Sequence, residues 1–284
     1  MVDDPVNCDL MIGTSGYSYP EWVDAGFYPK DTQSGKMLTA YSKVFSATEL
    51  NYTWYQMPKP YAVERMCQNI PKQFYFAAKL TRTMTHEIDP DMWKSQAAQY
   101  KDGISPLLQS GRLLAVLLQM PPYFDRSQKN RSYLAWLLDE LASLPLAVEF
   151  RHRSWAQDKV FTELEKRKVA LVSVDEPDLP NLFPKLDVVT NPDLFYIRFH
   201  GRNKAAWGSG SMQKQFDYNY SDEELQEWTD NKLGKMTSKA QKGAIFFNNH
   251  VRAQAPENAL RLISRLIKTG KIDEGKINHP FEHC

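Results

Sequence analysis

The chain has 284 residues, of which 42% are hydrophobic and 24% are charged, and its formal net charge is +1. This composition is that of an ordinary soluble globular protein, and it argues against a nucleic-acid binder with a large positive excess. The first residues lack the basic start and apolar run of a signal peptide, and no stretch of about 20 apolar residues could span a membrane. We therefore expect a cytoplasmic protein without membrane contact.

Eight short apolar or β-branched runs recur along the chain. They lie at residues 10–16, 46–51, 74–80, 112–120, 145–152, 169–176, 194–202 and 243–250. Most are nearly continuous hydrophobic segments, which is typical of parallel strands that are covered on both faces. Each run ends in polar residues, so we expect these polar groups to gather at one end of a parallel sheet.

Amphipathic helix patterns lie between most of these runs. Ser127 is placed to cap a helix whose apolar stripe is formed by Leu134, Leu137, Leu138 and Leu141. Ser221 begins another helix, because the acidic residues 222–224 suit the positive end of a helix dipole. Pro256 opens a last helix that Gly270 ends.

Two connections lack a helical pattern. The segment 176–193 contains four prolines, so we expect an irregular loop in place of the sixth helix. The segment 203–220 is expected to form an extended loop over the mouth of the fold.

The alternation of strands and helices predicts right-handed βαβ units and a parallel sheet. Eight strands at intervals of roughly 30 residues match an α/β protein with a TIM-type (β/α)8 barrel. The barrel domain spans residues 10–270, with tails at 1–9 and 271–284. An open doubly wound sheet is the alternative.

The strands alternate in a way that predicts a polar pocket. In the run at 194–202, Phe195, Ile197 and Phe199 share one face, whereas Arg198, His200 and Arg202 share the other. Active sites of such barrels lie at the C-terminal ends of the strands, where alternate residues point inward. Charged residues on the inward side are unfavourable without partners or a function, so we predict a pocket.

The polar strand ends define the candidate site. The candidate catalytic residues are Glu49, Glu149, Asp175 and His200. The candidate substrate-binding residues are Lys79, Arg151, Arg198, Arg202, Asn51, Gln119, Asn248, Asn249, His250, His86, Tyr17 and Trp22. Because arginine binds phosphate or carboxylate through two parallel hydrogen bonds, the excess of basic residues favours an anionic ligand. The alternative is that pairs such as Glu149–Arg151 and Asp175–Arg198 neutralise this charge.

Two further features have more than one interpretation. The first loop carries Tyr17, Tyr19, Trp22, Phe27 and Tyr28, which either form a stacking wall for a base or sugar or pack the loop onto the barrel. The carboxylates and His200 are metal-ligand types, but neighbouring arginines would compete with a divalent cation. No HExxH motif or CxxC pair is present. We predict no cofactor, and a divalent metal is the minor alternative.

Several long motifs resemble the YecE-like family, domain of unknown function 72. They are IGTSGYSYPEW, TELNYTWY, FAAKLTRTMTH, LLQMPPYF, AVEFRHRSW, VDEP, FYIRFHGR, DYNYSDEEL and FFNNH, and they run from Ile12 to about Leu266. Small departures occur at Trp54, where the family usually has Phe, and at Tyr17, where Trp is common. The resemblance implies a TIM-type barrel and implies little about a reaction, because the family is named for lacking one.

Our leading hypothesis is an enzyme that acts on a phosphate-bearing or other anionic substrate, including a nucleotide or a nucleic-acid end, by hydrolysis or other processing of a phosphate ester. Glu149 or Asp175 would serve as general base and His200 as the paired acid. One alternative is a non-catalytic nucleic-acid-binding module. The other is a metal-dependent isomerase or hydrolase. The sequence does not specify the oligomeric state.

Overall fold

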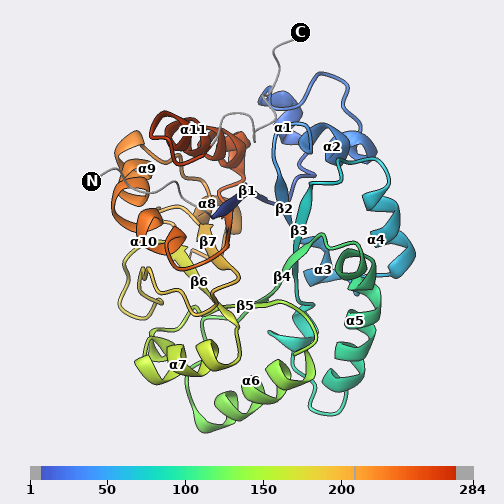
Figure 1. Ribbon diagram of the computed structural model, residues 1–284, viewed down its shortest axis with the longest axis vertical. Helices are drawn as coiled ribbons and strands as arrows, with labels where there is room; N and C mark the ends of the chain where they lie inside the picture. The colour runs from blue at the N-terminus through green and yellow to red at the C-terminus, as the bar shows by residue number, and fades with distance from the viewer. Residues whose placement is uncertain (1–7, 208, 273–284) are drawn as a thin grey trace.

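The computed structural model describes residues 8–207 and 209–272 (Figure 1). Eight parallel strands hydrogen-bond in chain order, and β8 closes on β1. The strands are β1 (Asp9–Ser15), β2 (Ala47–Leu50), β3 (Tyr75–Lys79), β4 (Leu113–Gln119), β5 (Leu146–Glu149), β6 (Ala170–Asp175), β7 (Phe195–Phe199) and β8 (Lys242–Phe247). This closed barrel confirms the predicted fold class and excludes the open doubly wound sheet.

The helices surround the barrel as an outer layer (Figure 1). They are α1 (Glu21–Asp24), α2 (Ser34–Tyr41), α3 (Tyr52–Tyr55), α4 (Pro60–Cys67), α5 (Trp93–Gln109), α6 (Gln128–Glu140), α7 (Asp158–Lys166), α8 (Met212–Gln215), α9 (Asp222–Trp228), α10 (Gly234–Thr237) and α11 (Gln254–Lys268). Short turns of other helix types are η1 (Arg82–Met84), η2 (Arg153–Trp155), η3 (Thr229–Leu233) and η4 (Val251–Ala253). Among the described residues, no helix has the length and apolar character needed to cross a bilayer.

The helix ends follow the capping signals in the sequence. Ser127 caps α6, since its side chain accepts a hydrogen bond from the backbone N–H of Asn130. Ser221 and Glu224 form a reciprocal capping box at the start of α9. The last helix begins at Gln254, two residues before the predicted start, because residues 254 and 255 already have helical geometry.

The two faces of β7 differ as the alternation predicts. Phe199 points outward, where its ring stacks on Phe247 at a centroid distance of 4.4 Å and meets Trp228 of α9 at 5.1 Å. Phe195 also points outward, and its ring lies so close to Gly243 that a Cβ there would approach within 2.2 Å. The bulky apolar groups therefore pack beneath the helices, and the opposite face of β7 is left for polar side chains.

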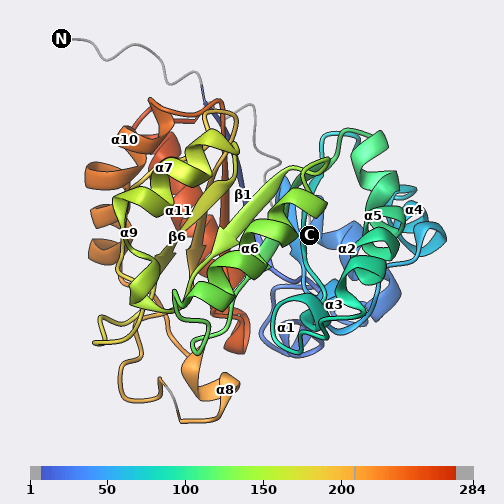
Figure 2. The same ribbon diagram turned by 90° about the horizontal axis from the view of Figure 1, so that it is seen from below.

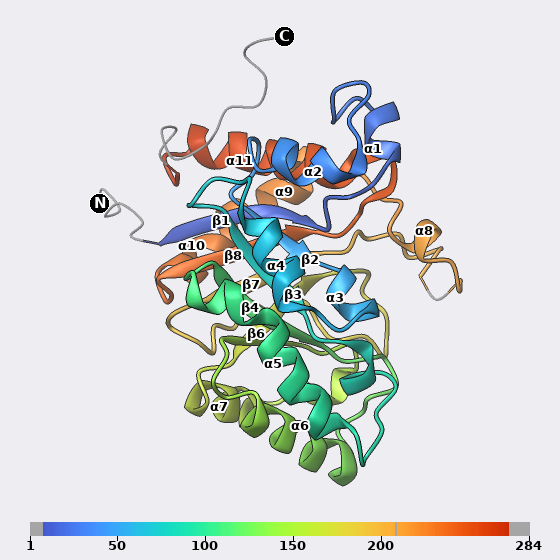
Figure 3. The same ribbon diagram turned by 90° about the vertical axis from the view of Figure 1, so that its right-hand side faces the viewer.

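The connections shape the C-terminal end of the barrel. No helix forms between Asp175 and Phe195 within the described chain, as the proline-rich sequence predicts. The loop after β7 contains α8, which projects beyond the ends of the strands (Figure 3). The predicted N-terminal tail is one residue too long, because β1 already begins at Asp9. The remaining tail residues, 1–7 and 273–284, lie outside the described chain.

Candidate functional site at the C-terminal mouth of the barrel

A cavity of about 1680 Å³ opens at the C-terminal end of the strands. The segments that carry α1, α3 and α8 lie at this end of the molecule (Figure 2). Nine of the predicted site residues line the cavity, namely Tyr17, Glu49, Asn51, Lys79, His86, Gln119, Arg151, Asn248 and His250. The structure therefore brings together residues from strands that are far apart in the sequence.

Arg198 lies beneath the cavity in the centre of a buried ion network. Its guanidinium donates to Oε1 of Glu49 at 2.7 Å and to Oε2 of Glu149 at 2.6 Å, and all three side chains are at most 1% exposed. The Tyr196 hydroxyl donates to the other oxygen of Glu49 at 2.7 Å. Arg198 points inward as predicted, but it is absent from the cavity wall and two internal carboxylates occupy its donors.

The electrostatics of this network favour its charged state. Burial opposes charge on Arg198, yet the carboxylates of Glu149 and Glu49 hold its pKa above the ordinary value. Burial likewise raises the pKa of Glu149, but Arg151 and Arg198 lower it more, and the net pKa lies well below the usual range. Buried charges are stable when each one is paired and hydrogen-bonded, which is the case here.

Arg151 joins this network to the cavity wall. Its Nε lies 2.5 Å from Oε1 of Glu149, its Nη1 donates to Glu176 at 2.8 Å, and its Nη2 lies 3.0 Å from Nε2 of His200. The predicted Glu149–Arg151 pair is thus present. The hydrogen bonds of Arg151 come from Nη1 and Nη2, each of which carries two N–H donors, so each of these nitrogens keeps one further donor, and Arg151 lines the cavity.

His200 is buried and uncharged at neutral pH. Burial first, and the nearby Arg151 second, lower its pKa to about 3. Nε2 of His200 lies 3.0 Å from Nη2 of Arg151 and 3.3 Å from Oε1 of Glu149, and Nδ1 lies 3.1 Å from Nδ2 of Asn248. The arrangement favours the neutral ring, whereas the predicted acid role requires the protonated one.

Glu176 belongs to the same network, although it is absent from the candidate residues chosen by sequence. Its carboxylate oxygen Oε2 accepts from Arg151, and burial raises the pKa of the group to about 8. At neutral pH Glu176 is therefore protonated. Strand alternation could have found it, because Glu176 follows Val172 and Val174 on the inward face of β6.

Lys79 ends β3 and lines the cavity. Its Nζ lies 5.4 Å from the centre of the Trp54 ring, and within residues 8–207 and 209–272 no hydrogen bond or ion pair engages this nitrogen. Burial, followed by the positive charge of Arg198, lowers the pKa of Lys79 to about 8. Unlike Arg151 and Arg198, this cation has no carboxylate partner in the part of the chain that the structure describes.

His86 and Trp54 complete this side of the cavity. Nδ1 of His86 lies 2.9 Å from the Thr85 hydroxyl, and the imidazole meets the Trp54 ring edge-on at 5.1 Å. Burial and the neighbouring Lys79 lower the pKa of His86 to about 4, so the ring is uncharged at neutral pH.

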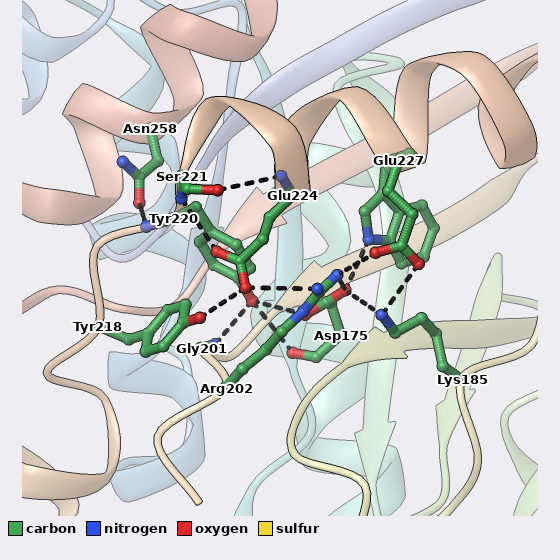
Figure 4. A network of polar contacts seen from close by, with 11 residues as sticks. Asp175, Lys185, Gly201, Arg202, Tyr218, Tyr220, Ser221, Glu224, Glu227 and Asn258 are labelled. Atoms are coloured by element: carbon green, nitrogen blue, oxygen red, sulfur yellow. Dashed lines mark hydrogen bonds and ion pairs between the residues drawn. The ribbon is translucent and has the colours of Figure 1, made fainter.

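Asp175 and Arg202 do not line the cavity. They lie together in a separate network of polar contacts (Figure 4). The two Asp175 oxygens accept from Nε and Nη2 of Arg202, both at 2.7 Å, and Trp228 of α9 donates to Asp175 at 2.6 Å. Lys185 approaches at 3.1 Å. This network attaches the helical layer to the sheet, and the alternative pair Asp175–Arg198 does not form.

Strand geometry explains why these two residues were placed wrongly. Asp175 is in register with the outward-facing Phe199, so it points away from the cavity. Arg202 was assigned to the inward face by extending the alternation of β7, but Gly201 has a φ of +89° and turns the chain. Only glycine adopts this geometry readily, so the alternation ends there.

Two other predicted site residues, Asn249 and Trp22, hydrogen-bond to segments next to the cavity. Asn249 donates to the backbone oxygen of Tyr218 at 2.7 Å and to Asn258 at 2.8 Å. Trp22 is fully buried, and its indole N–H donates to the backbone oxygen of His250 at 2.8 Å. Both therefore pack or position neighbouring segments and do not line the cavity.

The aromatic first loop divides between packing and exposure to the cavity. Tyr17 and Tyr19 line the cavity, whereas Trp22 and Tyr28 are buried. Tyr19 stacks on His250 with ring centres 4.9 Å apart. The packing interpretation therefore applies to Trp22 and Tyr28, and a stacking role for Tyr17 and Tyr19 stays a prediction.

A metal site was the minor alternative. Among the side chains that the structure describes, no group of three or more His, Cys, Asp or Glu is arranged to hold a metal ion.

Comparisons with known proteins agree with the fold. The model of the family described as protein of unknown function DUF72 matches residues 11–279. The UPF0759 protein YunF of Bacillus subtilis is 29% identical over 271 residues, which cover 90% of this chain and 94% of that protein. A DUF72 family crystal structure from Thermotoga maritima has 34% identity and a TM-score of 0.82, covering 91% of this chain and 99% of that one. Another from Enterococcus faecalis has 26% identity and a TM-score of 0.82, covering 91% and 95%.

Proposed function

The chain belongs to the DUF72 family of proteins of unknown function, and from this starting point we propose that the barrel mouth is the active site of an enzyme for a small anionic substrate, such as a phosphate ester. The observation that carries the proposal is the ammonium group of Lys79, which faces the cavity without a carboxylate partner among the described residues. Unpaired charge in a cavity is unfavourable unless a ligand completes it.

The charge of the surrounding network supports an anionic ligand. Lys79, Arg151 and Arg198 are cationic at neutral pH. Glu149 is ionised, and Glu49 accepts hydrogen bonds at both oxygens as a carboxylate does, whereas Glu176, with its pKa of about 8, is protonated. One positive charge is therefore in excess, which suits one small anion better than a long polyanion.

Polar groups around Lys79 are suited to orient a substrate. Asn51, Gln119 and Asn248 line the cavity with amide side chains, and Arg151 adds the further N–H donors of Nη1 and Nη2. Glu49 is the one predicted catalytic carboxylate in the cavity wall. Since Arg198 and Tyr196 hold both of its oxygens, Glu49 is a positioned general base for the proposed reaction.

Sulfate binding tests the proposal, because sulfate keeps its charge across the relevant pH range. Isothermal titration calorimetry should show sulfate binding to the protein at pH 7 and at least tenfold weaker binding to Lys79→Met. The control is Lys94→Met, since Lys94 also lies beside a tryptophan, 5.7 Å from the Trp93 ring centre, but is exposed. Absence of sulfate binding, or equal binding by Lys79→Met, would overturn the proposal.

The pH dependence provides a second test. Lys79 and Glu176 both have pKa values of about 8, so both groups lose protons over the same range. Raising the pH from 7 to 9 then changes the network from an excess positive to an excess negative charge. We expect sulfate affinity to fall over this range, and an affinity that does not change would contradict the charge assignment.

A further inference from the structure

We propose that the amine of Lys79 is a covalent nucleophile that forms an imine with the carbonyl carbon of a small anionic aldehyde or ketone. The inference rests on the proposed function, because it names the substrate class of the same site. The geometry that carries it is a primary amine at the C-terminal end of β3, on a residue that lines a large cavity, with no hydrogen-bond or ion-pair partner among the described residues.

The surroundings of Lys79 differ from those of a structural lysine. A lysine that supports a fold is usually engaged by a carboxylate, as Lys101 is by Glu140 at 2.8 Å. In contrast, the nearby carboxylates Glu49 and Glu149 are hydrogen-bonded to Arg198. The Lys79 nitrogen is thus left to contact whatever enters the cavity.

Desolvation and neighbouring cations are the known means by which proteins activate a lysine amine. Both act here, since burial and Arg198 are the two largest causes that lower the pKa of Lys79 to about 8. With a pKa of about 8 against the usual 10.5, Lys79 therefore has a much larger fraction of free amine at pH 7 than an ordinary lysine.

The reaction balances with the atoms present. The ammonium first passes one proton to an acceptor, for which the Glu49 carboxylate lies in the same cavity wall. The nitrogen lone pair attacks the carbonyl carbon, a C–N bond forms and the C–O π electrons move to oxygen. That oxygen takes up two protons, one returned by the acceptor and one from nitrogen, and leaves as water. One proton stays on the nitrogen of the iminium product.

The product preserves the electrostatics of the network. An ammonium ion and a carbonyl compound give a protonated imine and water, so the nitrogen carries one positive charge before and after the reaction. Arg151, Arg198 and the ionised carboxylates Glu49 and Glu149 therefore meet no new buried charge. The face of the Trp54 ring, which lies against the Lys79 nitrogen, suits this cation as it suits the ammonium.

The anionic group of the substrate would contact Arg151. Arg151 lines the cavity and keeps one further N–H donor on each of Nη1 and Nη2, and Gln119 and Asn248 line the same cavity. This arrangement favours carbonyl compounds that carry a carboxylate or a phosphate. Guanidinium binds both the planar carboxylate and the tetrahedral phosphate well. Experiment must therefore determine which of the two groups the substrate carries.

Reductive trapping tests the inference. The full-length protein is incubated at pH 8 with pyruvate, which carries a carboxylate, or with dihydroxyacetone phosphate, which carries a phosphate, and then treated with sodium borohydride. Borohydride reduces an imine to a stable secondary amine, which peptide mass spectrometry locates. We expect modification of Lys79 at least ten times faster than of the exposed Lys94, with the more reactive probe identifying the anionic group.

Two variants and the pH dependence provide the controls. Lys79→Arg keeps the positive charge but has no nucleophilic amine, so it should bind sulfate and yield no adduct at position 79. Lys94→Arg should trap the probes at Lys79 as the unmodified chain does. At saturating probe, where binding no longer limits the rate, trapping should become faster between pH 7 and 9, because the free amine fraction of a group with a pKa of about 8 increases over this range.

Each outcome separates this inference from the proposed function. Sulfate binding together with no adduct from either probe would overturn the imine and leave the anion site intact. Equal modification of Lys79 and Lys94 would also overturn it, because the amine would then have no special reactivity. Loss of both sulfate binding and trapping in the unmodified chain would overturn both proposals.

Discussion

The Arg198→Met substitution tests whether the buried ion network stabilises the barrel. Arg198 is 1% exposed and contacts the carboxylates of Glu49 and Glu149, which are both 0% exposed. Methionine is unbranched and apolar, so it fills much of the same space. The substitution therefore removes the charge and leaves two buried carboxylates with fewer donors.

The expected loss of stability is large. Removing one partner from a buried ion pair destabilises a protein by about 3–5 kcal/mol, because the remaining charge is uncompensated. Here Glu149 keeps Arg151, whereas Glu49 retains just the Tyr196 hydroxyl. We therefore expect a loss of about 4 kcal/mol, a large share of the roughly 5–15 kcal/mol by which proteins are usually stable.

Urea denaturation followed by circular dichroism measures this effect as a shift of the midpoint at constant slope. The matched control is Arg167→Met, since Arg167 also contacts two carboxylates, Asp139 and Glu163, but at the surface. Exposed pairs contribute about 0–1 kcal/mol, so this variant should change little. The double variant Arg198→Met with Glu49→Gln should recover part of the loss, because the unpaired charge is removed. Equal losses for Arg198→Met and Arg167→Met would refute the reasoning.

Two further predictions concern the outer network and the buried histidine. Asp175→Asn should destabilise the protein by about 3 kcal/mol through loss of a buried charge pair with Arg202, while sulfate affinity stays unchanged. A change in sulfate affinity at least as large as that of Lys79→Met would instead place Asp175 in the site. His200 has a pKa of about 3, against 6.5 in an unfolded chain, so its contribution to stability is present above pH 6.5 and is lost as the pH falls toward 3. His200→Gln should therefore lose less stability in acid than the unmodified chain. Urea midpoints measured from pH 7 to 4 test this. Midpoints that fall equally steeply for both proteins would contradict it.

Local sequence patterns predicted the barrel and left an open doubly wound sheet as the alternative, which the closed barrel excludes. Continuous apolar runs that alternate with amphipathic helices require a covered parallel sheet, and eight of them close into a barrel. The capping residue Ser221 and the proline-rich segment after β6 act over a few residues, so their effects can be read from the sequence. The inward direction of Arg198 and Glu49 followed from the same alternation within strands.

The partners of these side chains were decided by the tertiary structure. Arg198 contacts Glu49 from 149 positions away, and no local pattern determines whether a guanidinium meets an internal carboxylate or a ligand. The turn at Gly201 directs Arg202 out of the barrel to Asp175, whereas Glu176 points inward from the next position. Sequence alone therefore predicted a polar mouth. The tertiary structure decided that Lys79 is the cation without a carboxylate partner there among the described residues. The physical reason is that pairing depends on the distances between strands, which are set when the barrel closes.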